Sequence, residues 1–130
     1  MSWTKPFLEK IKANYFKNTY PLLLEIEKSD KVKLILKDIE YFVSKEGVQI
    51  STSQIRNIYD KAIKEKTAND LYLLKPNLAY TAARQDKEFK KLFFAFIDDL
   101  LTKVNDKNIN SFKIIMEALV AYHKYYGKTK

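Results

Sequence analysis

The chain has 130 residues, a length that suits a single domain with a hydrophobic core of its own. Its 24 Lys and Arg against 16 Asp and Glu leave a formal net charge of +8, which favours polyanionic partners such as nucleic acid or an anionic membrane surface. The absence of Cys excludes a disulfide framework, a thiol nucleophile and a thiolate metal site, and it fits a reducing cytoplasm.

The backbone composition favours helices. Two Gly and three Pro are too few for the tight turns of a multi-stranded sandwich, whereas helices joined by short polar loops need fewer such residues. The first residues lack an apolar stretch of signal-peptide length, and apolar runs such as residues 92–97 are too short to span a bilayer. We therefore predict an all-α, soluble protein of the cytoplasm.

Apolar residues at spacings of three and four predict five amphipathic helices. They cover residues 31–45, 53–66, 68–85, 87–104 and 111–126. Pro76 lies inside the third, where its ring removes a backbone donor and clashes with the carbonyl of Tyr72, so we expect a kink or break near Lys75. The side chains expected to cap these helices are Asp30, Ser51 or Thr52, Asp86, and Asn110 or Ser111.

The first 30 residues carry a weaker pattern. Apolar residues at helical spacing predict a short helix, and Pro21 interrupts the chain before a second apolar run. We expect residues 1–30 to form a helical N-terminal extension packed on a core bundle of residues 31–127. The predicted fold is one domain, residues 1–130, built as a compact antiparallel bundle of about five helices.

Catalytic chemistry is not indicated by the titratable residues. His123 is the sole histidine and lies on the apolar side of the last helix, so we interpret it as a buried structural side chain. Asp98 and Asp99 are adjacent and point about 100° apart on a helix, which predicts a solvated face rather than a shared metal or proton. Gly47 and Gly127 lie too far apart to form a phosphate-binding loop. We therefore predict no enzyme activity, no cofactor and no metal site.

Three stretches are more specific than a generic bundle requires. Residues 50–58 place hydroxyl side chains at a helix start and Arg56 in the first turn, where free amides and a guanidinium fork attract phosphate. Residues 73–84 end with Arg84, and residues 116–127 interleave aromatic rings with cations that can stack on bases and meet phosphates. Each stretch has a structural alternative: a capped helix with a solvated Arg, an Arg that favours the helix dipole, and core rings beside solvated lysines.

In this order and spacing, the stretches resemble the small helical subunit of the type III-A CRISPR effector complex, the Csm complex. The motifs that carry the resemblance are STSQIR at residues 51–56, LYLLKPNLAYTAAR at residues 71–84 and EALVAYHKYYG at residues 117–127. The last motif is the most specific, and the similar region extends from about Val32 to Gly127.

The resemblance implies a five-helix bundle without enzymatic activity, several copies of which line up head to tail along the guide RNA and its target RNA. It also implies contacts with the backbone subunit that carries the cleaving aspartate, and a role in sensing guide–target complementarity for the large signalling subunit. On this basis Arg56 and Arg84 are the first candidates for RNA contact, followed by Lys75 and Lys124. Tyr80 is expected to be a packing residue.

Two other interpretations of the sequence remain open. A basic helical module or scaffold could bind a protein partner through an exposed apolar patch, without any RNA. The second interpretation is a membrane-surface role or a concealed enzymatic role. The basic C-terminal residues support membrane contact only weakly, so we expect no membrane partner.

Overall fold

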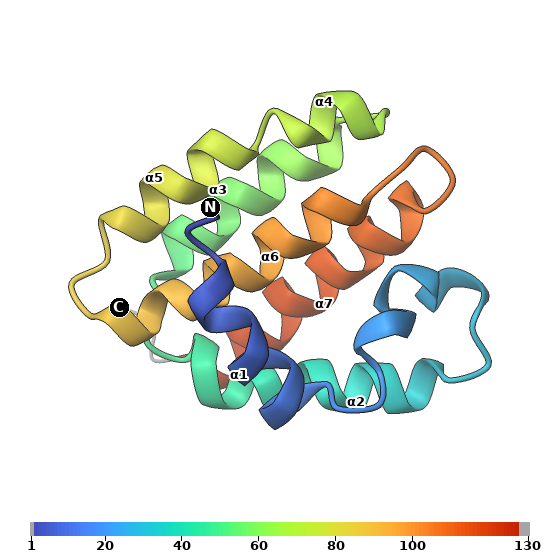
Figure 1. Ribbon diagram of the computed structural model, residues 1–130, viewed down its shortest axis with the longest axis horizontal. Coiled ribbons are helices and arrows are strands. Elements are labelled where there is room, and N and C mark those ends of the chain that lie inside the picture. Colours follow the sequence, from blue (N-terminus) through green and yellow to red (C-terminus); the bar gives the residue numbers. More distant parts are fainter. Residues whose placement is uncertain (1, 128–130) are drawn as a thin grey trace.

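The computed structural model describes residues 2–127, and every regular element in that range is helical (Figure 1). The α-helices are α1 (Lys5–Tyr15), α2 (Val32–Phe42), α3 (Thr52–Lys64), α4 (Ala68–Tyr72), α5 (Lys75–Ala83), α6 (Lys91–Lys103) and α7 (Ile109–Tyr126). The remaining segments are the 3₁₀ helices η1 (Tyr20–Lys28) and η3 (Glu88–Lys90) and the π-helical η2 (Val43–Gly47). The predicted all-α class is confirmed.

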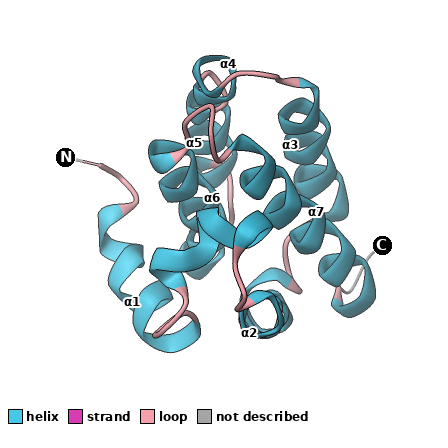
Figure 2. Ribbon diagram, turned by 90° about the vertical axis from the view of Figure 1, so that its right-hand side faces the viewer, coloured by secondary structure: helices cyan, strands magenta, loops and turns pink. Residues whose placement is uncertain are grey.

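Two antiparallel helices run through the middle of the molecule: α6 and α7 point in opposite directions (Figure 1). α1 and α5 pack against α6, whereas α2, α3 and η1 pack against α7. Seen at 90° to that view, α3, α4 and α5 lie on the opposite side of α6 from α2 (Figure 2). Among residues 2–127, α3 and α5 therefore have outer faces that no other helix covers.

α6 is apolar on nearly every face, which is the pattern of a helix surrounded by other elements. Its buried apolar side chains are Leu92, Phe93, Phe94, Ala95, Phe96, Ile97, Leu100 and Leu101. Each large side chain moved from water into the core contributes roughly 1.5–3 kcal/mol. This helix is therefore the main contributor to the core on which the surface helices are held.

The N-terminal segment enters the same core. The ring of Phe16, between α1 and η1, stacks on that of Phe96 with centroids 5.0 Å apart, and Phe42 of α2 lies 4.8 Å from Phe96. Ile11 and Leu23 are fully buried as well. The helical N-terminal segment is confirmed, and it supplies interior side chains rather than only an outer cover.

Two local predictions about helix ends are confirmed. Ser51 caps α3, since its Oγ accepts a hydrogen bond from the Gln54 N–H at 3.0 Å. The third predicted helix is broken into α4 and α5, and Pro76 lies in the first turn of α5, where its missing N–H is not needed. The break fixes where α5 begins and therefore which of its side chains face α3.

Other predicted caps are wrong. Lys31, not Asp30, precedes α2, and it makes no side-chain cap. The Asp86 carboxylate accepts a hydrogen bond from Lys90 Nζ at 2.8 Å instead of capping a helix. α7 begins at Ile109 rather than at 111 because an asparagine turn precedes it, in which the Asn105 N–H donates to Asn108 Oδ1 at 2.7 Å.

The side chain of Tyr20 links η1 to α6, and we expect its ionisation to make the stability of the fold sensitive to alkaline pH. Its hydroxyl donates to Asp99 Oδ2 at 2.5 Å, and burial followed by this hydrogen bond raises its pKa above the ordinary 10.0. Tyrosines of the unfolded chain lose their protons near pH ~10 while folded Tyr20 keeps its proton, so its contribution to stability is present below that pH and is lost above it. Urea unfolding between pH ~9 and ~11 should show a steeper fall in the free energy of unfolding for wild type than for Tyr20→Phe. Equal slopes would contradict this.

Candidate nucleic-acid interface

A polar groove with a volume of about 350 Å³ lies between the first half of α3 and residues 77–84, which run along α5 to its C-cap. Its lining residues are Ser53, Gln54, Asn57, Asn77, Tyr80, Thr81 and Arg84. None of them is aliphatic, so the groove offers hydrogen-bonding groups, one aromatic ring and one guanidinium. A groove of this composition suits a polar, anionic ligand better than an apolar one.

Side-chain amides fix the two walls of the groove to each other. Gln85, which follows α5, donates through Nε2 to Gln54 Oε1 at 3.2 Å and to the Thr81 carbonyl at 2.9 Å. Gln54 is also the residue whose N–H is capped by Ser51. The end of α5 is thereby held over the N-terminal turn of α3, the positive end of that helix's dipole.

Both predicted arginines are exposed, and within residues 2–127 neither takes part in an ion pair. The Arg84 guanidinium lies over the ring of Tyr80 at 5.4 Å, and that of Arg56 lies over Tyr59 at 5.7 Å. A ring below a guanidinium orients it and leaves its N–H groups free for an incoming oxygen. Both cations therefore keep their hydrogen-bonding capacity for a ligand, and Arg84 lines the groove itself.

Tyr80 and Asn77 are groove residues that the sequence did not reveal. Tyr80 is exposed, so the expectation that it packs is wrong. It lies four residues before Arg84, a spacing that places both on one helix face and could have indicated the pair. Asn77 Oδ1 is buried and has no hydrogen-bond partner among residues 2–127, which leaves an acceptor in the groove wall.

Lys75 does not line the groove, and its side chain contacts α6 instead. Its Nζ lies 3.1 Å from Asp98 Oδ1 and 2.6 Å from Thr102 Oγ1, both on α6, and the ammonium also lies over the Tyr72 ring at 5.0 Å. Lys75 therefore holds α5 against α6, at the opposite end of α5 from Arg84. The expectation that Asp98 lies on a solvated face is also wrong, because its residue exposure is only 2%.

Lys124 is exposed in the last turn of α7. The preceding residue, His123, is buried and its Nε2 hydrogen-bonds the carbonyl of Ile50 at 2.8 Å, directly before α3 begins. This confirms His123 as a structural side chain. It also anchors the end of α7, and with it Lys124, beside the chain that enters α3.

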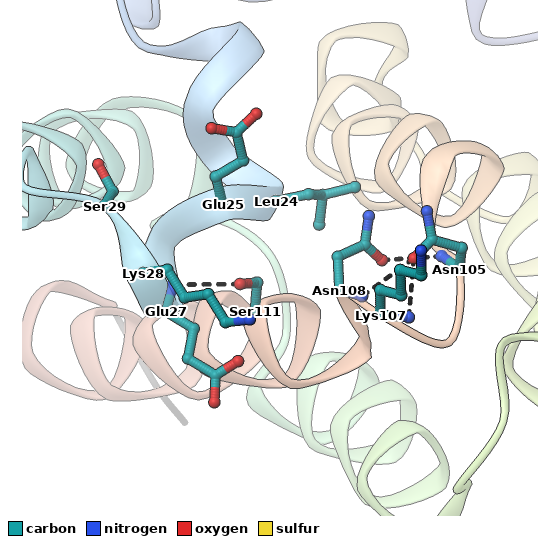
Figure 3. Close-up of a pocket in the computed structure, with 9 residues that line it drawn as sticks. All are labelled: Leu24, Glu25, Glu27, Lys28, Ser29, Asn105, Lys107, Asn108 and Ser111. Atoms are coloured by element: carbon teal, nitrogen blue, oxygen red, sulfur yellow. Dashed lines mark hydrogen bonds between the residues drawn. The ribbon is translucent and has the colours of Figure 1, made fainter.

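Another pocket, about 320 Å³, lies between η1 and the loop joining α6 to α7 (Figure 3). Its lining mixes Glu25 and Glu27 with Lys28 and Lys107, and the Glu27 N–H donates to Ser111 Oγ at 3.1 Å. This balanced charge gives no preference for an anion. In the described part of the chain, no three His, Asp or Glu side chains gather closely enough to hold a metal ion. No helix there has the length and apolarity to cross a membrane.

Comparison with known proteins identifies the family. The model of the family described as Csm2 Type III-A matches residues 29–129, which includes α3, α5 and α7 and all four predicted site residues. Neither the curated proteins nor the solved structures give a match. The matched region covers most of the chain, so this protein belongs to the Csm2 Type III-A family, the small subunit of the type III-A CRISPR complex.

Proposed function

We propose that this chain is a non-catalytic RNA-binding subunit that lines the guide–target duplex of a type III-A interference complex in the cytoplasm and helps to monitor complementarity. The observation that carries the proposal is the groove between α3 and α5, which is lined by Arg84 and by Ser53 near the start of α3. Family membership makes a multi-subunit Csm complex the setting in which this groove works.

The chemistry of the groove fits an RNA backbone. A guanidinium fork matches the geometry of a phosphate, and the first turn of α3 adds oriented amides and a positive dipole end. Asn77 Oδ1 needs a donor, and the ribose 2′-hydroxyl of RNA is one that DNA lacks. Contacts of this kind read phosphates and sugars, so binding is expected to be independent of base sequence. That property suits a subunit that must accept any guide and target.

The proposed partners follow from the same setting. Guide RNA and target RNA would lie along the arginine-bearing surface of α3 and α5, with Lys124 as a further phosphate contact from α7. Other copies of this chain, the backbone subunit and the large subunit would hold it in register along the duplex. The ion pair between Lys75 and Asp98 would hold α5 on α6 within the subunit.

Salt titration of RNA binding tests the proposal. Fluorescence anisotropy with a labelled single-stranded RNA and with a guide–target duplex should show affinity falling linearly on a log–log plot, with a slope of about 0.7–0.9 for each phosphate contacted. Scrambled sequences of equal length should bind equally well. Binding that is absent at low salt, or that depends on one sequence, would contradict the proposal.

A further inference from the structure

A second hollow, about 430 Å³, opens where the N-terminal residues meet the α4–α5 junction above α6. Its lining residues are Ser2, Trp3, Tyr72, Leu73, Lys75, Pro76 and Asp98. Trp3 precedes the region matched by the family model, so this wall of the hollow is added by residues outside that match. Aromatic and apolar side chains form most of it, and one buried carboxylate lies among them.

One carboxylate oxygen of Asp98 has no hydrogen-bond donor among residues 2–127. Its Oδ1 lies 3.1 Å from Lys75 Nζ, whereas its Oδ2 is buried and has no partner among residues 2–127. A buried acceptor without a donor costs free energy. Burial raises the pKa of this carboxyl, while the hydrogen bond and charge of Lys75 oppose the rise. A ligand that presents an N–H to Oδ2 would remove the cost.

The charge balance of the hollow selects the kind of donor. Lys75 already neutralises Asp98, so a second cation, such as an arginine side chain from a partner protein, would lie beside the Lys75 ammonium and be repelled. A neutral N–H donor meets no such repulsion. Tyr72 is 50% exposed and Leu73 is 74% exposed, so the walls also present apolar surface to solvent. A flat and largely apolar ligand would cover that surface.

We infer that this hollow binds a single unstacked nucleobase of single-stranded RNA, an inference that rests on the RNA-binding function proposed above. The base stacks on the rings of Tyr72 or Trp3 and donates an N–H from its edge to Asp98 Oδ2. Every RNA base carries such a donor, either an exocyclic amino group or a ring N–H. Recognition is therefore tolerant of sequence.

The position of the hollow relative to the groove supports a common ligand. Pro76, which lines the hollow, precedes Tyr80 and Arg84, which line the groove, at intervals of four residues. Residues at that spacing follow one another along one face of a helix. Eight residues of helix span about 12 Å, so phosphates of one strand can lie at Arg84 while a base of the same strand enters the hollow.

Trp3 gives a direct probe, because it is the only tryptophan of the chain. A base that stacks in the hollow should quench its emission. The full-length chain would be titrated at low salt with a short single-stranded RNA and with an abasic ribose-phosphate chain of the same length. We expect the RNA to quench Trp3 emission and the abasic chain to bind without quenching it. Equal quenching by both would overturn the inference.

A matched pair of substitutions tests the wall of the hollow. Tyr72 and Tyr41 are each 50% exposed, but Tyr41 lies on α2, away from the hollow. Tyr72→Ala should weaken RNA binding by about 5- to 150-fold, the range for loss of one base stack, and should reduce the quenching of Trp3. Tyr41→Ala should do neither. Circular dichroism of both variants checks that they fold.

The outcomes separate this inference from the proposed function. If RNA binds with the expected salt dependence but leaves Trp3 emission unchanged, and Tyr72→Ala binds as Tyr41→Ala does, the base pocket is wrong and the RNA-binding function stands. If no RNA binds at any salt concentration, both fail. Quenching by a partner subunit of the complex and not by RNA would assign the hollow to a protein contact and overturn the inference.

Discussion

Replacing Phe16 by Ala is expected to lower the free energy of unfolding by about 3–5 kcal/mol, the range for a large aromatic removed from a packed core. Phe16 is fully buried, and its ring stacks on Phe96 of α6 and lies 5.4 Å from that of Phe42. Its removal would leave a cavity where the N-terminal segment, α2 and α6 meet. Urea unfolding monitored by circular dichroism measures the effect.

Phe89→Ala is the matched control for this substitution. Phe89 lies in η3 and is exposed, so its loss should change the free energy of unfolding by no more than about 0.5 kcal/mol. If Phe16→Ala cost no more than Phe89→Ala, the N-terminal segment would be an outer cover on a core that is complete without it.

The double substitution Arg56→Ala and Arg84→Ala is expected to flatten the salt dependence of RNA binding and to weaken binding at least about tenfold at low salt. Each arginine that contacts a phosphate contributes about 0.7–0.9 to the log–log slope. Neither arginine has an ion-pair partner in residues 2–127, so their removal should leave the fold stable. Anisotropy titrations at several salt concentrations give both quantities.

Lys33→Ala with Lys37→Ala provides a control of equal charge. Both lysines are exposed on α2, on the opposite side of the molecule from α5 (Figure 2). If the loss of two positive charges were enough to weaken binding, this control would lose as much RNA affinity as the arginine variant does. An unchanged slope in the arginine variant would remove Arg56 and Arg84 from the interface.

Much of the fold follows from local patterns. The uninterrupted apolar spacing predicts a helix over residues 87–104, where α6 lies, and Pro76 predicts the break between α4 and α5. The N-terminal contribution to the core was harder to predict, because η1 is a 3₁₀ helix and does not follow the helical spacing of three and four. Phe16 lies between two elements, where no periodicity marks it as buried.

The candidate site was predictable only in part. Arg56 and Arg84 could be named from their motifs, but the groove exists because α5 folds back over α3, which spacing along one helix cannot show. The sequence predicts a solvated Asp98 because adjacent carboxylates on a helix point about 100° apart and cannot share a metal or proton. Its true environment depends on Lys75, 23 positions earlier in the chain, and on Trp3, near its start. Contacts of such separation leave no local signal.

Affinity purification through this chain is the most direct test of the central claim, that it holds RNA within a Csm complex. The chain would be co-expressed with the backbone and large subunits and a guide RNA, and recovered at moderate salt. The account predicts a multi-subunit particle that carries small RNA. Recovery of the chain alone and free of RNA, or with a protein partner that survives high salt without RNA, would contradict it.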